Sequence, residues 1–219
     1  MAYRNVSAES MKTILTGALG VLLLALATTA IVLYAGIPDA AADAPHADFV
    51  LRLIEWTRER SIARRIVDIT PPGDLAHPER TRRGAGNYAA MCAECHLSPG
   101  AQDSEIRRGL YPVPPNFSLP ATTVSNAERA AARRFWIIKH GIKASGMAAW
   151  SKGGMENAAI WDVVAFLGVL PSLSAEQYRQ QVAASDGHQH GNMPQATQPA
   201  VAPHHAHSAH DSKEHTHTH

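Results

Sequence analysis

Two cysteines and a histidine lie within five residues near the middle of the chain. They form the pattern C-x-x-C-H at Cys92, Cys95 and His96, and the sequence has no other cysteine. This pattern is the attachment signature of c-type haem. Within one helical turn, two thiols at this spacing can reach the two vinyl groups on one porphyrin edge, and the imidazole that follows can turn beneath the iron. The pattern therefore predicts one covalent haem c on Cys92 and Cys95, with His96 as an axial ligand of the iron.

Two other uses of a C-x-x-C pattern are disfavoured by the rest of the sequence. A thioredoxin-like dithiol would accompany a βαβ pattern, and no window shows sustained strand alternation. A structural zinc site would need a second ligand pair at regular spacing. A multihaem protein would need further copies of the motif.

The second axial ligand is predicted to be Met147. It follows Gly146, and a glycine lets the backbone approach a porphyrin closely. Ligation by histidine and methionine raises the reduction potential of the iron. His140 and Met155 are the alternatives, whereas Met91 is interpreted as a packing residue.

The imidazole of His96 needs an acceptor for its Nδ1–H, which fixes the ring and tunes its basicity. The proline-rich stretch after the motif can supply a carbonyl oxygen. Pro112 and Pro114 are the candidates.

An apolar segment near the N-terminus is long enough to span a membrane. Residues 13–36 contain no charged side chain, and about 20 apolar residues are needed to cross the hydrocarbon core. Charged residues flank the segment: Arg4 and Lys12 before it, Asp39 and Asp43 after it. The positive-inside rule therefore leaves residues 1–12 in the cytoplasm and places the haem domain outside, which in a bacterium is the periplasm. The alternative is a signal peptide cleaved near residues 40–42.

Residues 37–80 are expected to be a linker with an amphipathic helix over residues 45–70. Its apolar positions recur with helical spacing, and arginines cover the other side. We interpret it as a helix that packs on the next domain or crosses from the anchor to it. A helix lying on the membrane surface is the alternative, which the interspersed acidic residues disfavour.

Residues 81–173 are expected to form a compact all-α domain. Residues that typically start and end helices predict three helices. They run from about Glu79 into Cys92, from a capping box at Ser125–Glu128 to Gly141, and over about Glu156–Leu170. Tyr88 is expected to pack against Trp161 or Phe166 where the first and last of these helices cross. A glycine at Gly84 or Gly86 would permit a close crossing.

The net charge of the chain and its distribution limit the kinds of partner that we expect. The net charge of the chain is +1, which argues against a nucleic-acid-binding protein. Residues 81–173 contain ten lysines and arginines against six acidic residues, so an acidic patch on a redox partner could steer docking.

The last segment, residues 174–219, has a composition of its own. A short helix is expected from Ser174 to about Ala184, followed by disorder from Ser185, because aliphatic residues become too few to form a core. Nine of the 13 histidines lie in it: His188, His190, His204, His205, His207, His210, His215, His217 and His219. Neutral imidazoles bind Cu(II), Ni(II) and Zn(II), so the segment has the capacity to hold such metals; a solvated low-complexity tail is the equal alternative.

Residues 83–173 resemble the membrane-anchored monohaem class I cytochrome c family of bacteria. The resemblance is carried by the stretches Gly86–His96, Gly109–Pro115, His140–Trp150 and Trp161–Pro171. It implies a single-pass inner-membrane electron carrier rather than an enzyme. Its implied partners are a donor dehydrogenase or quinol oxidoreductase and an acceptor oxidase or reductase.

The chain departs from this resemblance at two places. Ala148 follows Met147 where many relatives have a proline that stiffens the loop, and the histidine-rich segment lies outside the family pattern. Two other functions stay open: a haem-bearing subunit of a larger oxidoreductase, and a metal-handling protein that acts through the histidine-rich segment. An enzyme in which Met147 detaches from the iron ranks last.

Overall fold

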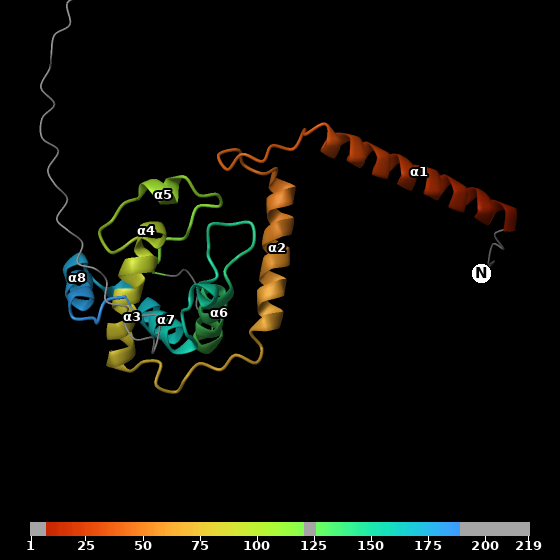
Figure 1. Cartoon of the computed structure of the whole chain (residues 1–219). Helices are drawn as coiled ribbons and strands as arrows, with labels where there is room; N and C mark the ends of the chain where they lie inside the picture. Colours follow the sequence, from red (N-terminus) through yellow and green to blue (C-terminus); the bar gives the residue numbers. More distant parts are fainter. Residues whose placement is uncertain (1–7, 121–125, 189–219) are drawn as a thin grey trace, which may run out of the picture.

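The computed structural model describes residues 8–120 and 126–188 of the chain. In these ranges all regular elements are helical and no strand occurs, so the all-α prediction is confirmed. An N-terminal helix, α1, leads away from a bundle formed by the other helices (Figure 1). The elements in chain order are α1 (Ala8–Tyr34), α2 (Asp48–Arg65), α3 (Pro78–Met91), α4 (Ala93–His96), α5 (Glu105–Arg108), α6 (Ala127–His140), the 3₁₀ turn η1 (Trp150–Gly153), α7 (Asn157–Val169), the 3₁₀ turn η2 (Leu170–Ser172) and α8 (Ala175–Ala183).

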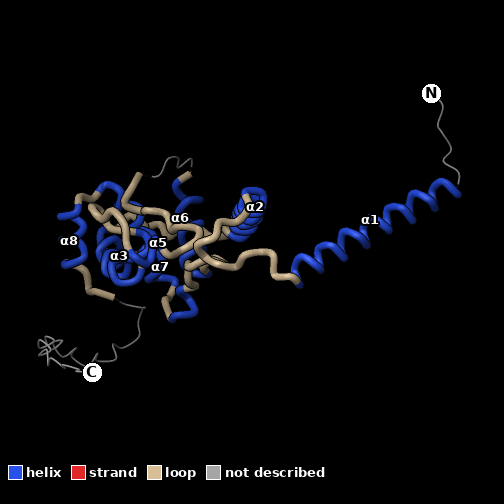
Figure 2. The backbone as a smooth tube through the Cα atoms, turned by 90° about the horizontal axis from the view of Figure 1, so that it is seen from above, coloured by secondary structure: helices blue, strands red, loops and turns tan. Residues whose placement is uncertain are grey.

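Helix α1 is long and apolar enough over residues 10–34 to cross a membrane. Its leucines, such as Leu22 and Leu24, are exposed because no part of the described chain packs on them. The loop of residues 35–47 connects α1 to α2 (Figure 2). This helix could therefore anchor the chain to a membrane, as the sequence predicts.

The centre of the bundle is the crossing of α3 and α7. A Cβ at Gly84 would collide with the carbonyl oxygen of Asp162 and would lie 2.9 Å from Cβ of Phe166, so only glycine permits this approach. The ring of Tyr88 packs 5.4 Å from that of Phe166, and both side chains are fully buried. The crossing predicted for Tyr88, Phe166 and Gly84 is confirmed.

Trp161 packs elsewhere, on α6. Its ring stacks on that of Phe135 with the centroids 4.2 Å apart. Helix α6 begins one residue later than a cap at Ser125 would place it: the side chain of Asn126 accepts the backbone N–H of Arg129 at 2.8 Å. The predicted capping box at Ser125–Glu128 is therefore wrong, because the neighbouring asparagine caps the helix.

A buried carboxylate joins α3 to α7 next to the crossing. Asp162 accepts hydrogen bonds from Arg80 at 2.9 Å and from Arg83 at 2.7 and 3.1 Å. The hydrogen bonds with Asp162 raise the pKa of Arg83. Sequence patterns gave no sign of this cluster, because its members are about 80 residues apart along the chain.

Helix α8 extends the bundle beyond Leu173. Its N-terminus has a capping box between Ser174 and Gln177, and its Tyr178 is buried against Tyr88 and Phe166. The next residues lie on α3, where Arg82 donates to both carboxylate oxygens of Asp186 at 2.7 and 2.8 Å. The disorder predicted from Ser185 is thus wrong for residues 185–187.

Helix α2 covers α6 from the outside. Ile62 of α2 and Ile66, which follows the helix, form a small buried cluster with Ala132 of α6. Arg133 donates to both carboxylate oxygens of Glu59 at 2.8 and 3.0 Å. The prediction of a helix that packs on the following domain is confirmed over residues 48–65, within the predicted range 45–70. The expectation that one apolar side faces arginines on the other is wrong, because Ile62 is buried whereas Phe49, Leu53 and Trp56 are exposed.

Candidate haem-binding site

The C-x-x-C-H residues form a tight turn at the end of α3. Cys92 terminates α3, and its carbonyl oxygen accepts the backbone N–H groups of Cys95 at 3.1 Å and His96 at 2.8 Å. Leu97 follows with a φ of 63°, which redirects the chain out of the helix. The hydroxyl of Tyr88 donates to the carbonyl oxygen of Leu97 at 2.6 Å, so the crossing of α3 and α7 also fixes the residue after His96.

Both cysteines are free thiols in partly buried positions. Burial, together with the neighbouring Cys95, raises the pKa of the Cys92 thiol to about 12. Cys92 therefore stays protonated at neutral pH and has the character of a thiol packed at the edge of the core. Two reduced thiols within one turn are what covalent attachment to a porphyrin edge requires.

The imidazole of His96 is held at one nitrogen and on one face. Its Nδ1 lies 2.9 Å from the carbonyl oxygen of Pro115. The ring of Phe117 stacks on it with the centroids 4.3 Å apart and the planes 15° apart. The backbone N–H of Phe117 also donates to the carbonyl oxygen of His96 at 3.0 Å. The predicted acceptors Pro112 and Pro114 are wrong, although the acceptor belongs to the same proline-rich stretch.

This arrangement suits an axial ligand. With Nδ1 donating to Pro115, Nε2 is the nitrogen left to bind a metal. Burial lowers the pKa of His96, so the ring is neutral at pH 7. The donor set of this turn, with two thiols and a neutral imidazole, therefore fits haem c.

The proline-rich stretch is itself held by α5. Arg107 donates from Nε to the carbonyl oxygen of Pro114 at 3.1 Å and from Nη1 to Asp103 at 3.1 Å. Ser104 caps α5 and also donates to the carbonyl oxygen of Glu94 next to the haem motif. These contacts link both sides of His96, and the sequence did not single out Arg107 or Ser104.

Met147 lies in a loop that folds back on itself between α6 and η1. Its carbonyl oxygen accepts the backbone N–H of Ile142 at 3.1 Å, and its own N–H donates to the hydroxyl of Ser145 at 3.2 Å. Gly141 opens the loop with a φ of +66°, and a Cβ there would lie 2.6 Å from the carbonyl oxygen of Met147. The side chain of Met147 is half-buried and packs on the core cluster that also holds Cys92 and Phe117.

The alternative ligands occupy different surroundings. Met155 is buried in the core with 3% of its surface exposed, and Met91 also packs against that core. His140 is exposed at the end of α6, with its ring 5.1 Å from that of Trp136. These positions give Met155 and Met91 a packing role.

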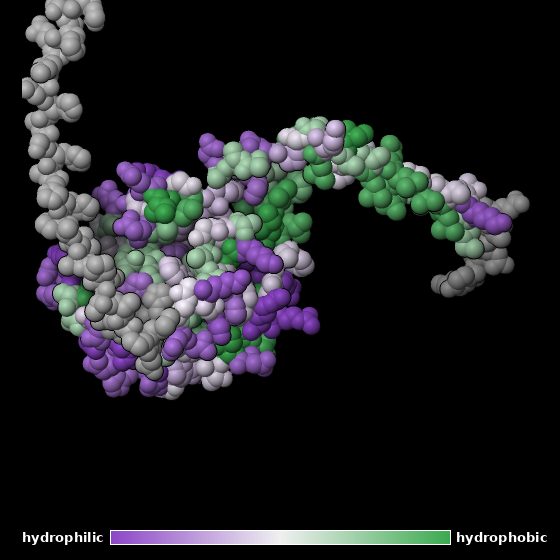
Figure 3. Space-filling model, in the orientation of Figure 1, coloured by the Kyte–Doolittle hydropathy of each residue, from purple (hydrophilic) through white to green (hydrophobic). Residues whose placement is uncertain are grey.

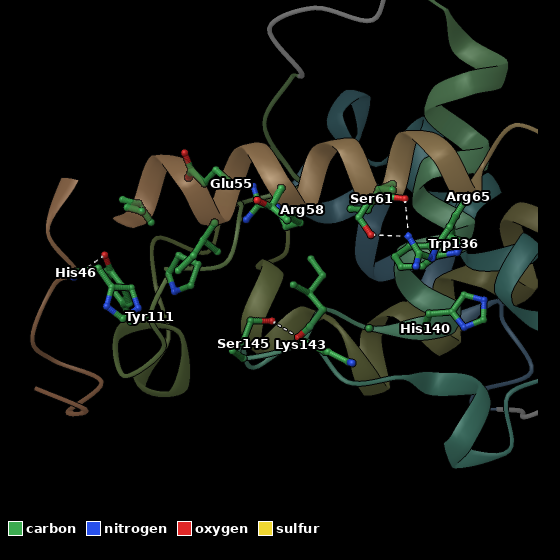
Figure 4. A pocket seen from close by; sticks show the side chains of 18 residues that line it. His46, Glu55, Arg58, Ser61, Arg65, Tyr111, Trp136, His140, Lys143 and Ser145 are labelled. Carbon is green, nitrogen blue, oxygen red and sulfur yellow. Dashed lines mark hydrogen bonds between the residues drawn. The ribbon is translucent and has the colours of Figure 1, made fainter. Parts of the chain in front are cut away.

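A cavity of about 530 Å³ lies on the side of the Met147 loop that faces α2. Side chains from α2, such as Arg58, and residues 140–145 of the loop line it (Figure 4). His140 lines this cavity as well. Any movement of residues 140–145 therefore also changes the shape of this cavity.

The predicted metal-binding histidines fall almost entirely outside the described residues. Only His188 belongs to them; the others, from His190 to His219, do not. Across residues 8–120 and 126–188, no group of three or more His, Cys, Asp or Glu side chains is placed to hold a metal ion.

Comparison with known proteins finds a matching family. Residues 79–167 match the model of a family described as cytochrome C oxidase, cbb3-type, subunit III. No curated protein and no solved structure matches the chain. The matched range begins with α3, includes the C-x-x-C-H turn and the Met147 loop, and ends within α7, so it contains every element that holds the predicted haem ligands. The match therefore supports the resemblance of residues 79–167 to class I monohaem c-type cytochromes.

Proposed function

We propose that the protein is a membrane-tethered, periplasm-facing carrier of single electrons. One haem c would be bound through Cys92 and Cys95, with His96 and Met147 as its axial ligands. When bound, this group supplies an iron that cycles between Fe(III) and Fe(II). The observation that carries the proposal is the His96 imidazole, which is neutral and held at Nδ1 by Pro115 beside two reduced thiols.

The residues of the chain have positioning roles in this function. Pro115 and Phe117 fix the His96 ring, so Nε2 would be the nitrogen that binds the iron. The Ser145 hydroxyl orients the backbone of Met147, whose thioether would complete the coordination. Two protein ligands leave no open position for a substrate, which supports electron transfer rather than bond-breaking catalysis.

A visible spectrum of the full chain, matured in a host that attaches haem c, tests this proposal. We expect haem that survives denaturation and a ferric far-red band from the thioether–iron bond. Covalent haem without that band would contradict Met147 as the ligand. A chain that leaves a competent host without covalent haem would overturn the haem assignment itself.

A second function is favoured by the family match, whose name describes an oxidase subunit. In that case the haem domain would be a fixed part of a larger oxidoreductase rather than a freely moving carrier. Solubilisation in mild detergent distinguishes the two functions. Stoichiometric comigration with other oxidase subunits would support the subunit, and migration alone would support the carrier.

Docking of the carrier on an acidic partner follows from the excess of basic residues in residues 81–173. Attraction between exposed charges is screened by salt. We expect the rate of reduction by the partner to fall as ionic strength rises. An unchanged rate would remove this part of the proposal.

A further inference from the structure

Helix α2 has a second face that packs on nothing in residues 8–120 and 126–188. Its inward face is buried on α6 through Ile62, and Ile66 just after the helix joins the same cluster. On the opposite side, Phe49, Leu53 and Trp56 are 74%, 59% and 60% exposed. Their spacing of four and three residues places them in one stripe along the helix. Figure 3 shows this hydrophobic surface on α2, next to the segment that leads to α1.

The charges of α2 are sorted between the two faces. Helical spacing places Arg52, Arg60 and Arg64 beside or in line with the apolar stripe, and all three are exposed. The guanidinium of Arg60 lies over the Trp56 ring, 5.7 Å from its centroid. This face therefore combines aromatic and aliphatic groups with positive charge.

Two of the three acidic residues of the same helix, Glu55 and Glu59, belong to the domain side, and the third, Asp48, is exposed in the first turn. Glu59 is paired with Arg133 of α6, and Glu55 lines the cavity between α2 and the Met147 loop. Glu55 and Glu59, two of the interspersed acids that disfavour membrane binding in the sequence, are thus turned away from the apolar stripe. The folded helix presents a basic, apolar face without a carboxylate within the stripe.

We propose that this face of α2 lies on the anionic lipid surface of the membrane that α1 spans. Phe49, Leu53 and Trp56 enter the interfacial region, and the arginines meet lipid phosphates. Trp at the headgroup level and basic residues beside an apolar stripe are the features of interfacial helices. The connecting residues 35–47 can extend no more than about 45 Å, so α2 stays within reach of the surface.

This contact would fix the orientation of the haem domain. The cavity and the Met147 loop lie on the side of α2 opposite the stripe, so the membrane would face away from the loop. The domain would then present the same edge to every partner. The inference depends on α1 as a membrane anchor and not on the redox role of the haem.

Spin labels on the full chain in nanodiscs test the proposal directly. In the haem-loaded protein Cys92 and Cys95 are thioethers, so Leu53→Cys supplies a single thiol. In nanodiscs with phosphatidylglycerol we expect this label to collide severalfold more with dissolved oxygen than with a water-soluble nickel chelate. The matched control is Gln180→Cys on the exposed surface of α8, which should show the opposite preference.

Two further variants separate the possible failures. Leu23→Cys in α1 reports whether the anchor is inserted, and repeating the labels in a Cys92→Ser/Cys95→Ser background makes the test independent of haem. The combined Arg52→Gln, Arg60→Gln and Arg64→Gln variant should move the Leu53 label toward water. With the anchor inserted, a Leu53 label as open to the nickel chelate as the α8 control would overturn the proposal and would leave the face to a protein partner.

Discussion

The segment that presents His96 and the loop that presents Met147 are held in different ways. His96 is fixed by an acceptor at Nδ1, a stacked ring and a backbone bond from Phe117, and the adjoining Leu97 is bonded to buried Tyr88. Met147 is positioned through its backbone and one serine hydroxyl, while its side chain has no polar contact to direct it. The His96 side chain is thus held by direct contacts to its ring, whereas the Met147 side chain is positioned only through its backbone and its packing.

The largest difference is expected from removing each ligand in turn. His96→Ala should reduce covalent haem per protein to a small fraction of the parent level, because the attached group would lose its preorganised ligand. Met147→Ala should keep covalent haem, lose the far-red band and lower the reduction potential by a large part of the roughly 0.8 V range that axial ligands span. Haem staining and spectroelectrochemistry measure both. Equal haem content in the two variants would contradict the proposed difference between His96 and Met147.

The His96 segment should depend on the α3–α7 crossing for its stability. Gly84→Ala places a methyl group against the carbonyl oxygen of Asp162, and overpacking of this kind costs about 1–3 kcal/mol. Chemical denaturation of the haem-loaded protein measures the loss.

The matched control is Gly168→Ala in α7, where a Cβ meets no atom within 4 Å. In that exposed helical position, alanine should stabilise the protein by up to about 1 kcal/mol. A destabilisation of the same size in both variants would contradict the dependence of the His96 segment on the α3–α7 crossing.

Ser145 restrains the Met147 loop through its hydroxyl. Ser145→Ala removes the hydroxyl that donates to Ile142 and accepts from Met147, a change worth about 1 kcal/mol. We expect faster binding of imidazole to the ferric iron with little change in global stability. Stopped-flow absorbance measures this rate.

Ser172→Ala is the control, because its hydroxyl also bonds to a carbonyl oxygen three residues earlier but lies outside the loop. Its imidazole-binding rate should equal that of the parent. If the two serine variants behave alike, the loop is held by something other than Ser145.

Local patterns predicted the parts of this molecule that depend on neighbouring residues. The C-x-x-C-H turn, the helix ends near Met91 and Val169, and the cap at Ser174 all follow from spacing and turn chemistry. Pro115 lies 19 positions after His96, so its identification as the acceptor required the path of the chain between them. The proline content alone does not give that path. The choice of Asn126 over Ser125 depended on backbone conformation, since both residue types cap helices well.

Long-range features were beyond the sequence for a different reason. Asp162 with Arg80 and Arg83, and Arg82 with Asp186, join residues about 80 to 104 positions apart. Helix and strand periodicity in the sequence does not identify such distant pairs. The sequence also did not show which face of α2 is buried, because acidic and basic residues are interspersed along it. Packing on α6 places Glu55 and Glu59 on the domain side.

The short connection over residues 35–47 has a kinetic consequence. A domain held to a membrane by so few residues explores a shell of limited volume and meets a partner in the same membrane at an effective concentration in the millimolar range. Each encounter would then be a first-order event, set by tether length and lateral diffusion. The turnover of such a pair would not change when the suspension is diluted, unlike that of a soluble carrier.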